Sequence, residues 1–209
     1  MNQEKFCESK NISEIPKSIE LNELISILSD AKIPLESWGK GKAKTIDHLM
    51  SEIENGEAKL IINELGKIER HINVATVIVT HTDKDGVIYS LREEKQIFKD
   101  GRVRERNFPT SVSEKFKENE SPEEAGRRAL SEELDIHQIE EFTQLAPCSN
   151  VEESQSYPGL STYHNKYPFT AKIGVEEFSQ NGYIEEQSDK TNYFVWDIVD
   201  GYNPPNLKR

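Results

Sequence analysis

The chain has 209 residues, which allows one domain of common size with an appendage but is too short for two full catalytic domains. Its net charge of −12 argues against extended contact with a nucleic-acid backbone, because such binding needs basic patches. The polar N-terminus lacks the apolar run of a signal peptide, and no stretch approaches about 18 consecutive apolar residues. We therefore expect a cytoplasmic protein that does not enter a membrane and whose charge allows a small phosphorylated ligand.

The first 56 residues predict a flexible lead-in followed by helices. Apolar residues repeat at helical spacing from residue 21 to residue 28, after a charged stretch that ends near residue 18. Thr45 is a suitable cap for a second helix that ends before Gly56. We therefore expect an N-terminal extension over residues 1–56 and a main domain over residues 57–209.

The main domain begins with segments that favour strands. Residues 58–63 and 67–80 are rich in β-branched side chains, and a turn over residues 82–86 leads into a third apolar segment. This order predicts an antiparallel meander. Further strands are expected at residues 101–108, 140–145, 163–173 and 192–199.

The best-marked helix begins at Ser121 or Pro122. Ser121 is a good N-cap, and proline fits the first helical position because no amide donor is needed there. Glu124, three residues after the cap, completes a capping box. At about 100° per residue, Leu130 and Leu134 share one side of the helix, so we expect them to be buried.

Two adjacent carboxylates, Glu132 and Glu133, fall on a neighbouring arc of this helix, with Ala129 between them. Ionised carboxylates held side by side repel each other unless water, an arginine or a hard divalent cation neutralises them. Arg128, one turn before Glu132, can offset part of the repulsion. A solvated acidic helix face is the alternative to a metal site.

The segment 114–136 resembles a degenerate Nudix box. The signature of that family reads Gly, five residues, Glu, seven residues, Arg-Glu-aliphatic-any-Glu-Glu-any-Gly-aliphatic. Six of the nine defined positions match, at Glu120, Arg128, Leu130, Glu132, Glu133 and Ile136. The departures are Glu114 and Asp135 in place of glycines and Ala129 in place of a glutamate.

The resemblance implies an α/β fold, a Nudix-type α/β/α sandwich with a mixed sheet preceded by the helical extension. It also implies a divalent-metal-dependent pyrophosphohydrolase that cleaves the diphosphate bond of a nucleoside diphosphate linked to another moiety. Glu132 and Glu133 would hold Mg²⁺ or Mn²⁺, and Arg128 would brace the box together with Glu120, which could also assist the attacking water. The resemblance is also compatible with a homodimer.

Arginines at three alternating positions precede the box. Arg102, Arg104 and Arg106 would share one face of a strand, where guanidinium groups could bind phosphate oxygens. A charged strand edge that discourages aggregation explains the pattern equally well.

Acidic residues outside the helix could replace the missing box glutamate. Many Nudix proteins have a late loop that contributes a glutamate as metal ligand or general base, and by this resemblance Glu185, Glu186 and Asp189 are candidates, with Glu186 preferred. Lesser candidates are Glu114, Glu118, Glu152 and Glu153.

The three departures from the signature support a second hypothesis. Because Ala129 stands where the signature has a carboxylate, one ligand is lost and cation binding should be weaker. Mg²⁺ nevertheless often binds through only one or two protein carboxylates. The alternative to a hydrolase is therefore a catalytically impaired Nudix-fold module that binds a nucleotide ligand or a protein partner.

Overall fold

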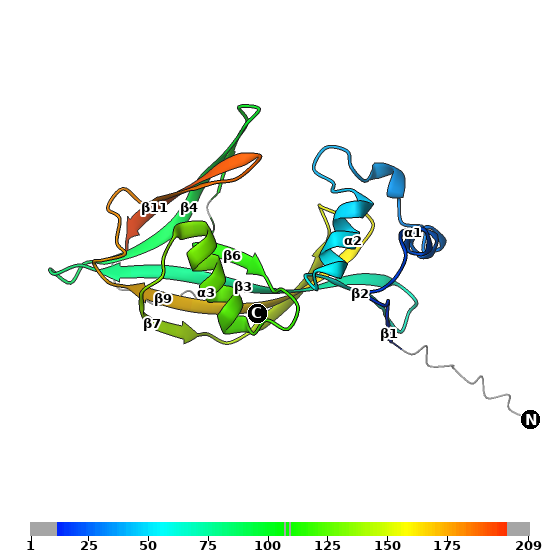
Figure 1. Cartoon of the computed structure of the whole chain (residues 1–209), viewed down its shortest axis with the longest axis horizontal. Helices are drawn as coiled ribbons and strands as arrows, with labels where there is room; N and C mark the ends of the chain where they lie inside the picture. The colour runs from blue at the N-terminus through cyan, green and yellow to red at the C-terminus, as the bar shows by residue number, and fades with distance from the viewer. Residues whose placement is uncertain (1–11, 107, 109, 200–209) are drawn as a thin grey trace, which may run out of the picture. The chain divides into compact units, whose positions relative to one another are not determined.

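A computed structural model describes residues 12–106, 108 and 110–199 (Figure 1). Its contacts divide the chain into two compact units. The N-terminal unit comprises residues 12–73, 117–119 and 150–165, and the box unit comprises the described residues of 74–116, 120–149 and 166–199. Within these ranges no helix is long and apolar enough to cross a membrane.

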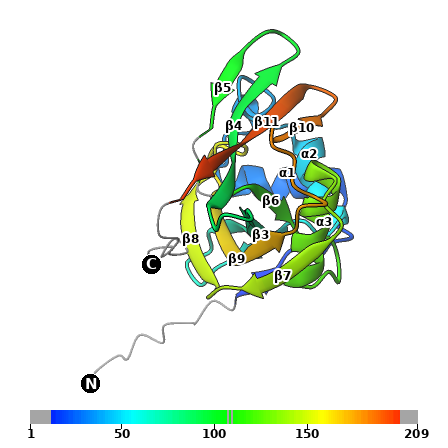
Figure 2. The same cartoon turned by 90° about the vertical axis from the view of Figure 1, so that its left-hand side faces the viewer.

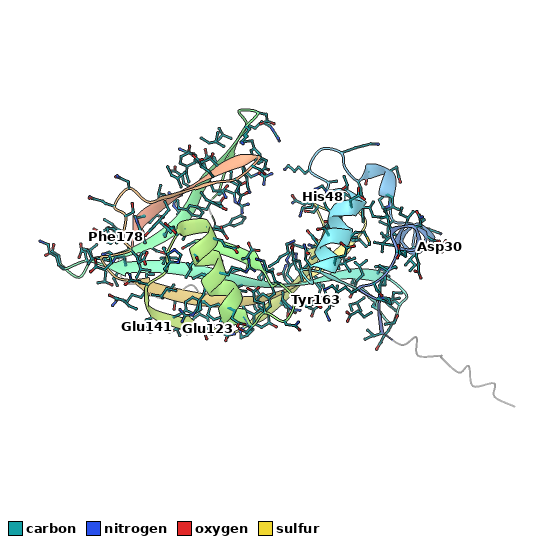
Figure 3. The ribbon with its side chains drawn as sticks, in the orientation of Figure 1. Asp30, His48, Glu123, Glu141, Tyr163 and Phe178 are labelled. Carbon is teal, nitrogen blue, oxygen red and sulfur yellow. The ribbon has the colours of Figure 1, made fainter. Side chains whose placement is uncertain are left out.

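The N-terminal unit combines helices with an antiparallel sheet. Its elements are β1 (Ser13–Glu14), α1 (Leu21–Asp30), the short 3-10 helix η1 (Leu35–Ser37), α2 (Ile46–Glu54), β2 (Lys59–Ile62), the start of β3 (Ile68–Thr82), the end of β8 (Cys148–Glu153) and the start of β9 (Ser161–Ile173). Strand β2 pairs with both β1 and β3. Thr45 caps α2 as expected, and its capping box is completed by His48 (Figure 3). Leu24, Leu28 and Leu49 from the helices share one core with Leu60 of β2.

The two predicted N-terminal helices are present, but an extension made of helices alone is not supported. The helices pack in a unit that also contains strands and the distant segment 150–165. The sequence predicted one boundary at residue 56, whereas each unit is assembled from separate stretches of the chain. Apolar periodicity identifies the buried face of a helix but not the segment that covers it.

The box unit contains the larger set of strands. Its elements are the rest of β3, β4 (Ile88–Phe98), β5 (Val103–Glu105), β6 (Val112–Lys115), α3 (Pro122–Leu134), β7 (Ile139–Gln144), the first residues of β8 (Cys148–Glu153), the second half of β9 (Ser161–Ile173), β10 (Tyr183–Glu186) and β11 (Lys190–Ile198). The meander is antiparallel as predicted, since β3 pairs antiparallel with β4. Strand β4 continues to Phe98, beyond the predicted segment.

Helix α3 begins where its sequence predicts. The Ser121 hydroxyl accepts a hydrogen bond from the Glu124 amide at 3.3 Å, and the Glu124 carboxylate accepts one from the Ser121 amide at 2.8 Å. The helix ends at Asp135, whose left-handed backbone (φ 55°, ψ 30°) is the conformation that glycine adopts most easily at this position. Aspartate is among the few other residues that tolerate it, so the departure from the signature preserves the helix end.

Strands β5, β4, β11 and β10 lie in that order as one antiparallel ribbon (Figure 2). One row of facing residues crosses all four strands, from Arg104 through Gln96 and Asn192 to Glu185. Facing residues of paired strands project from the same face of a sheet. This row therefore presents polar side chains on one face of the ribbon.

Candidate functional site

A cavity of about 380 Å³ lies in the box unit, lined by residues of α3, β4, β6, β10 and β11. Figure 3 shows the side chains around α3, with Glu123 marking its first turn. Five carboxylates line the cavity, those of Glu93, Glu114, Glu132, Glu133 and Glu185. Among the described lining residues the cationic groups are Arg106 and Lys190, so negative charge is in excess by three.

Glu133 has the least satisfied carboxylate of the cavity. Its Oε1 atom is buried and has no hydrogen-bond partner within the described part of the chain. Burial, and to a smaller extent the nearby charges of Glu185, Glu114 and Glu93, together raise the pKa of Glu133 to about 9, against a lowering by Lys190. The group therefore needs either a proton or a bound cation.

Arg128 braces the box through four neighbouring groups. Its guanidinium donates to both oxygens of Glu120, at 2.7 and 2.9 Å, and to the Lys115 carbonyl at 2.8 Å. It also lies 3.1 Å from Glu132 and 3.5 Å from Glu114. Hydrogen bonding to Glu120 is the main cause of a raised Arg128 pKa. Glu120 is thus bound at both oxygens and is not among the described residues that line the cavity.

The predicted position of Ala129 on the metal-binding face is wrong. Ala129 is completely buried in the core, with Leu130 and Ala125, and is not among the described lining residues of the cavity. Leu130 and Leu134 are buried as predicted. The buried stripe of α3 is wider than the two leucines indicated, because small residues complete it. A glutamate at position 129 would have to place its carboxylate in or through this core.

Glu114 brings a carboxylate to the cavity where the signature has a glycine. It lies on β6, opposite Ala75 of β3. Burial raises the pKa of Glu114, while Arg128 acts in the opposite direction. The sequence made this residue a lesser candidate, yet it lines the cavity with Glu132 and Glu133.

The three arginines do not act as one group. Arg106 lines the cavity, donates to Glu93 at 2.9 Å and lies 4.1 Å from the centre of the Phe108 ring. Arg102 and Arg104 instead stack on Phe98, at 4.8 and 5.4 Å from its ring centre. Both are exposed and lie outside the described lining of the cavity. Of the predicted phosphate-binding arginines, only Arg106 is at the cavity.

The late acidic segment contributes Glu185 and not Glu186. Glu185 lines the cavity and accepts hydrogen bonds from Gln187 at 2.7 Å and Asn192 at 2.5 Å. Glu186 is the next residue on β10 and is exposed, because successive side chains of a strand point to opposite faces. Asp189 is also exposed.

The remaining acidic candidates belong to the N-terminal unit. Glu118 pairs there with Lys17, and Glu152 pairs with His164. Glu153 is exposed on β8. None of these three is among the residues described as lining the acidic cavity.

Among the cavity residues that sequence reasoning did not identify are Glu93, Gln96 and Asn192. Glu93 is 8% exposed and accepts a hydrogen bond from Gln96 at 2.7 Å. Strand alternation would place these two residues on opposite faces, since they are three apart. The register between β4 and β11 shifts by one residue next to Glu93, and this bulge brings both to the cavity. No signal in the sequence marks the bulge.

The donor chemistry of the cavity fits a hard divalent cation. Its carboxylate oxygens are the ligands that Mg²⁺ and Mn²⁺ prefer, and the unpartnered oxygen of Glu133 is the atom most in need of one. Over the residues that the structure describes, no three His, Cys, Asp or Glu side chains converge as a complete metal cluster. A cation here would therefore take one or two carboxylates and fill its other positions with water, amide or phosphate oxygens.

Three solved structures illustrate the similarity of this chain to known proteins. A MutT/nudix family protein from Enterococcus faecalis is 16% identical, with a TM-score of 0.44, over 64% of this chain and 46% of its own length. The Ap4A hydrolase of C. elegans is 12% identical, with a TM-score of 0.34, over 60% and 78%. The NUDIX domain of Shewanella oneidensis NrtR, complexed with ADP ribose, is 11% identical, with a TM-score of 0.34, over 60% and 71%.

No family model matches the chain, and no curated protein sequence matches it significantly. The chain spans less than half the length of the Enterococcus protein that it matches.

Proposed function

We propose that this protein is a divalent-metal-dependent hydrolase that cleaves the diphosphate bond of a nucleoside diphosphate linked to another moiety. The observation that carries the proposal is the acidic cavity with the buried, unpartnered carboxylate oxygen of Glu133. A volume of about 380 Å³ is within the usual range for small-molecule sites, roughly 300–1,000 Å³.

Glu132 and Glu133 are the residues that would hold Mg²⁺ or Mn²⁺. When bound, such a cation neutralises phosphate charge and polarises the phosphorus towards attack. Arg128 holds Glu132 at 3.1 Å and is itself fixed by Glu120, so the first of these carboxylates is positioned before any ligand arrives.

Arg106 would orient the phosphate, since it is the arginine at the cavity and its guanidinium is held by Glu93. Glu114 would act as general base, because a carboxylate with a raised pKa is better matched to proton transfer near neutral pH. The water oxygen forms a bond to one phosphorus while the bond from that phosphorus to the bridging oxygen breaks. The water proton passes to Glu114, and the bridging oxygen leaves with the other phosphate.

The burial of Ala129 favours a second candidate function. The signature has a glutamate at this position, and here it is occupied by a core residue that lacks a carboxylate. A module that binds a nucleotide ligand or a protein partner without turnover is therefore the alternative.

A direct assay separates the two candidates. Formation of the cleavage products, a nucleoside monophosphate and the other phosphate-bearing fragment, is measured with Mg²⁺ or Mn²⁺ for a panel of ADP-ribose, NADH, dinucleoside polyphosphates and nucleoside triphosphates. We expect turnover of at least one diphosphate-containing compound, and Glu133→Gln should lower it by at least about 100-fold because a metal ligand is lost.

Glu186→Gln is the matched control, since this neighbouring acid on β10 is exposed and lies away from the described lining of the cavity. It should retain the activity of the unaltered chain. Tight binding of a panel member without turnover in either metal would reject the hydrolase and support the binding module.

A further inference from the structure

A second cavity, of about 220 Å³, lies wholly within the N-terminal unit and is called here the N-terminal cavity. Its wall is formed by Arg70 of β3, by the end of β8 with the residues that follow it, and by Thr162 and His164 of β9. The two β9 residues share one face of the strand, because they are two positions apart. Tyr163 between them, labelled in Figure 3, lies on the other face and stacks on His71 at 4.9 Å between ring centres. None of the described residues of this wall lines the acidic cavity.

The Thr162 hydroxyl is buried at this wall. The residue is 1% exposed, and its Oγ1 atom has no hydrogen-bond partner within the described part of the chain. A buried hydroxyl without a partner destabilises the fold, and valine would fill nearly the same space without that cost. The hydroxyl therefore indicates a group that binds in the cavity and completes its hydrogen bonding.

Arg70 is the buried cation of the same wall. It is 6% exposed, and its Nε and Nη2 atoms both donate to Glu52 Oε2, at 3.1 and 2.6 Å. Its Nη1 atom makes no hydrogen bond to any residue that the structure describes. A guanidinium group is a planar fork of N–H donors, so Arg70 keeps donors that no described acceptor uses.

The charges around Arg70 favour an anion over a cation. Lys44 also donates to Glu52, at 2.8 Å, so two cations share one buried carboxylate. The three groups together carry one positive charge in excess. Charges attract most strongly where they are shielded from water, and Arg70 is the shielded cation of the three.

Two carboxylates also line the N-terminal cavity, but both are exposed to solvent. Glu152 pairs with His164 at 3.0 Å, and its side chain is 61% exposed. Glu153 is exposed on β8. Water screens exposed charges far more than buried ones, so these carboxylates oppose an anion less than Arg70 attracts it.

We propose that the N-terminal cavity binds a small oxyanion through Arg70 Nη1 and the Thr162 hydroxyl, with the hydroxyls of Ser154 and Ser156 as further donors. Charged guanidinium donors form strong hydrogen bonds with phosphate and carboxylate oxygens. The volume of about 220 Å³ is below the roughly 300–1,000 Å³ of common small-molecule sites, so the ligand is a phosphate or carboxylate ion of a few atoms.

The test is isothermal titration calorimetry of the full chain with sodium phosphate and, separately, with sodium acetate. Divalent metals are first removed on a chelating resin, and ionic strength is held constant. Heats of binding are preferred to a thermal shift, because phosphate stabilises folded proteins without binding to a site. We expect one anion per chain for at least one probe, and the probe that binds distinguishes a phosphate site from a carboxylate site.

Thr162→Val should weaken this binding at least about 10-fold, because a hydrogen bond to a charged ligand is lost. Thr162→Ser keeps the hydroxyl and should bind the anion as the unaltered chain does. Without the anion, Thr162→Val should melt no lower than the unaltered chain, since the hydroxyl that it lacks has no described partner. A hydroxyl with a purely structural role would lower the melting temperature when removed.

Thr80→Val is the matched control for the loss of a buried threonine hydroxyl. Thr80 is 8% exposed, but its hydroxyl donates to the Ala171 carbonyl at 3.5 Å, and the residue lies outside the described wall of the N-terminal cavity. This variant should keep the anion affinity of the unaltered chain.

An anion affinity that is unchanged in Thr162→Val overturns the proposal, as does the absence of saturable heat with both anions. Water is then the partner of the Thr162 hydroxyl. If Thr162→Val does not fold, Thr162→Ala takes its place and is compared with Thr162→Ser. Glu133→Gln should bind the anion normally, so failure of this site and failure of the proposed hydrolase are separate results.

Discussion

Glu52 in the N-terminal unit and Glu133 in the box unit are both carboxylates shielded from water, but they differ in what surrounds them. Glu52 accepts hydrogen bonds from Arg70 at 2.6 and 3.1 Å and from Lys44 at 2.8 Å. Glu133 has an oxygen without a partner among the described residues and lies near other carboxylates. Burial alone is common to both residues. Glu133 indicates a ligand site because the surrounding protein does not compensate its charge, whereas Glu52 is paired and does not.

The largest expected loss of stability comes from breaking the ion pairs of Glu52 with Arg70 and Lys44. Arg70→Met leaves Glu52 buried with Lys44, so we expect a loss of about 3 kcal/mol in the free energy of unfolding, measured in urea. The double variant Glu52→Leu/Arg70→Met should be less destabilised than Arg70→Met alone, because the uncompensated buried charge is gone. A double variant that loses the sum of both single effects would show that the two residues are not coupled.

A substitution at the core face of α3 should cost nearly as much. Ala129→Glu places a carboxylate where Ala129 is completely buried, so we expect a loss of at least about 2 kcal/mol in unfolding free energy. The same variant should not raise diphosphate turnover. Increased turnover with unchanged stability would mean that a side chain at position 129 can reach the cavity.

The raised pKa of Glu133 predicts that the stability of the folded chain falls as pH rises, whereas an ordinary paired carboxylate makes stability rise with pH. Its pKa is raised from 4.5 to about 9 in the folded chain, so the folded state holds a proton that the unfolded state has released. This contribution to stability is complete below pH 4.5 and is lost as pH rises towards 9, at no more than about 1.4 kcal/mol per pH unit.

Thermal or urea unfolding of the metal-free chain at several pH values measures this slope. Glu133→Gln should flatten it and should be at least as stable as the unaltered chain at pH 8. Burial of Glu114 adds a smaller slope of the same sign. An unchanged slope in Glu133→Gln would assign the pH dependence to other groups.

The smallest expected effects compare one helix cap in each unit. Ser121→Ala and Thr45→Ala each remove a capping side chain and should each cost about 1 kcal/mol of unfolding free energy. Only Ser121→Ala should also weaken Mn²⁺ binding, because α3 carries Glu132 and Glu133. Equal effects of both variants on Mn²⁺ affinity would contradict the assignment of the cation to α3.

The sequence predicted the helices and strands that are marked by a pattern within a few neighbouring residues, such as a cap or a β-branched run. The cap and the apolar spacing located α3, and β-branched runs located β2 and most of β3 and β9. Short or polar strands such as β8 and β10 were missed, because their side chains carry no clear alternation and pairing with a neighbour defines them. The role of Arg128 was indicated by the resemblance, and the structure shows the ion pair with Glu120 that underlies it.

The sequence by itself determined where α3 begins and that it carries two adjacent carboxylates, since capping and helical spacing act over a few residues. The tertiary structure decided which other groups meet those carboxylates. Strand register brings Glu185 to the cavity and turns Glu186 away, and a bulge in β4 brings Glu93 and Gln96 to one face. A shift of one residue in a strand reverses the side-chain face, and register depends on pairing across the sheet.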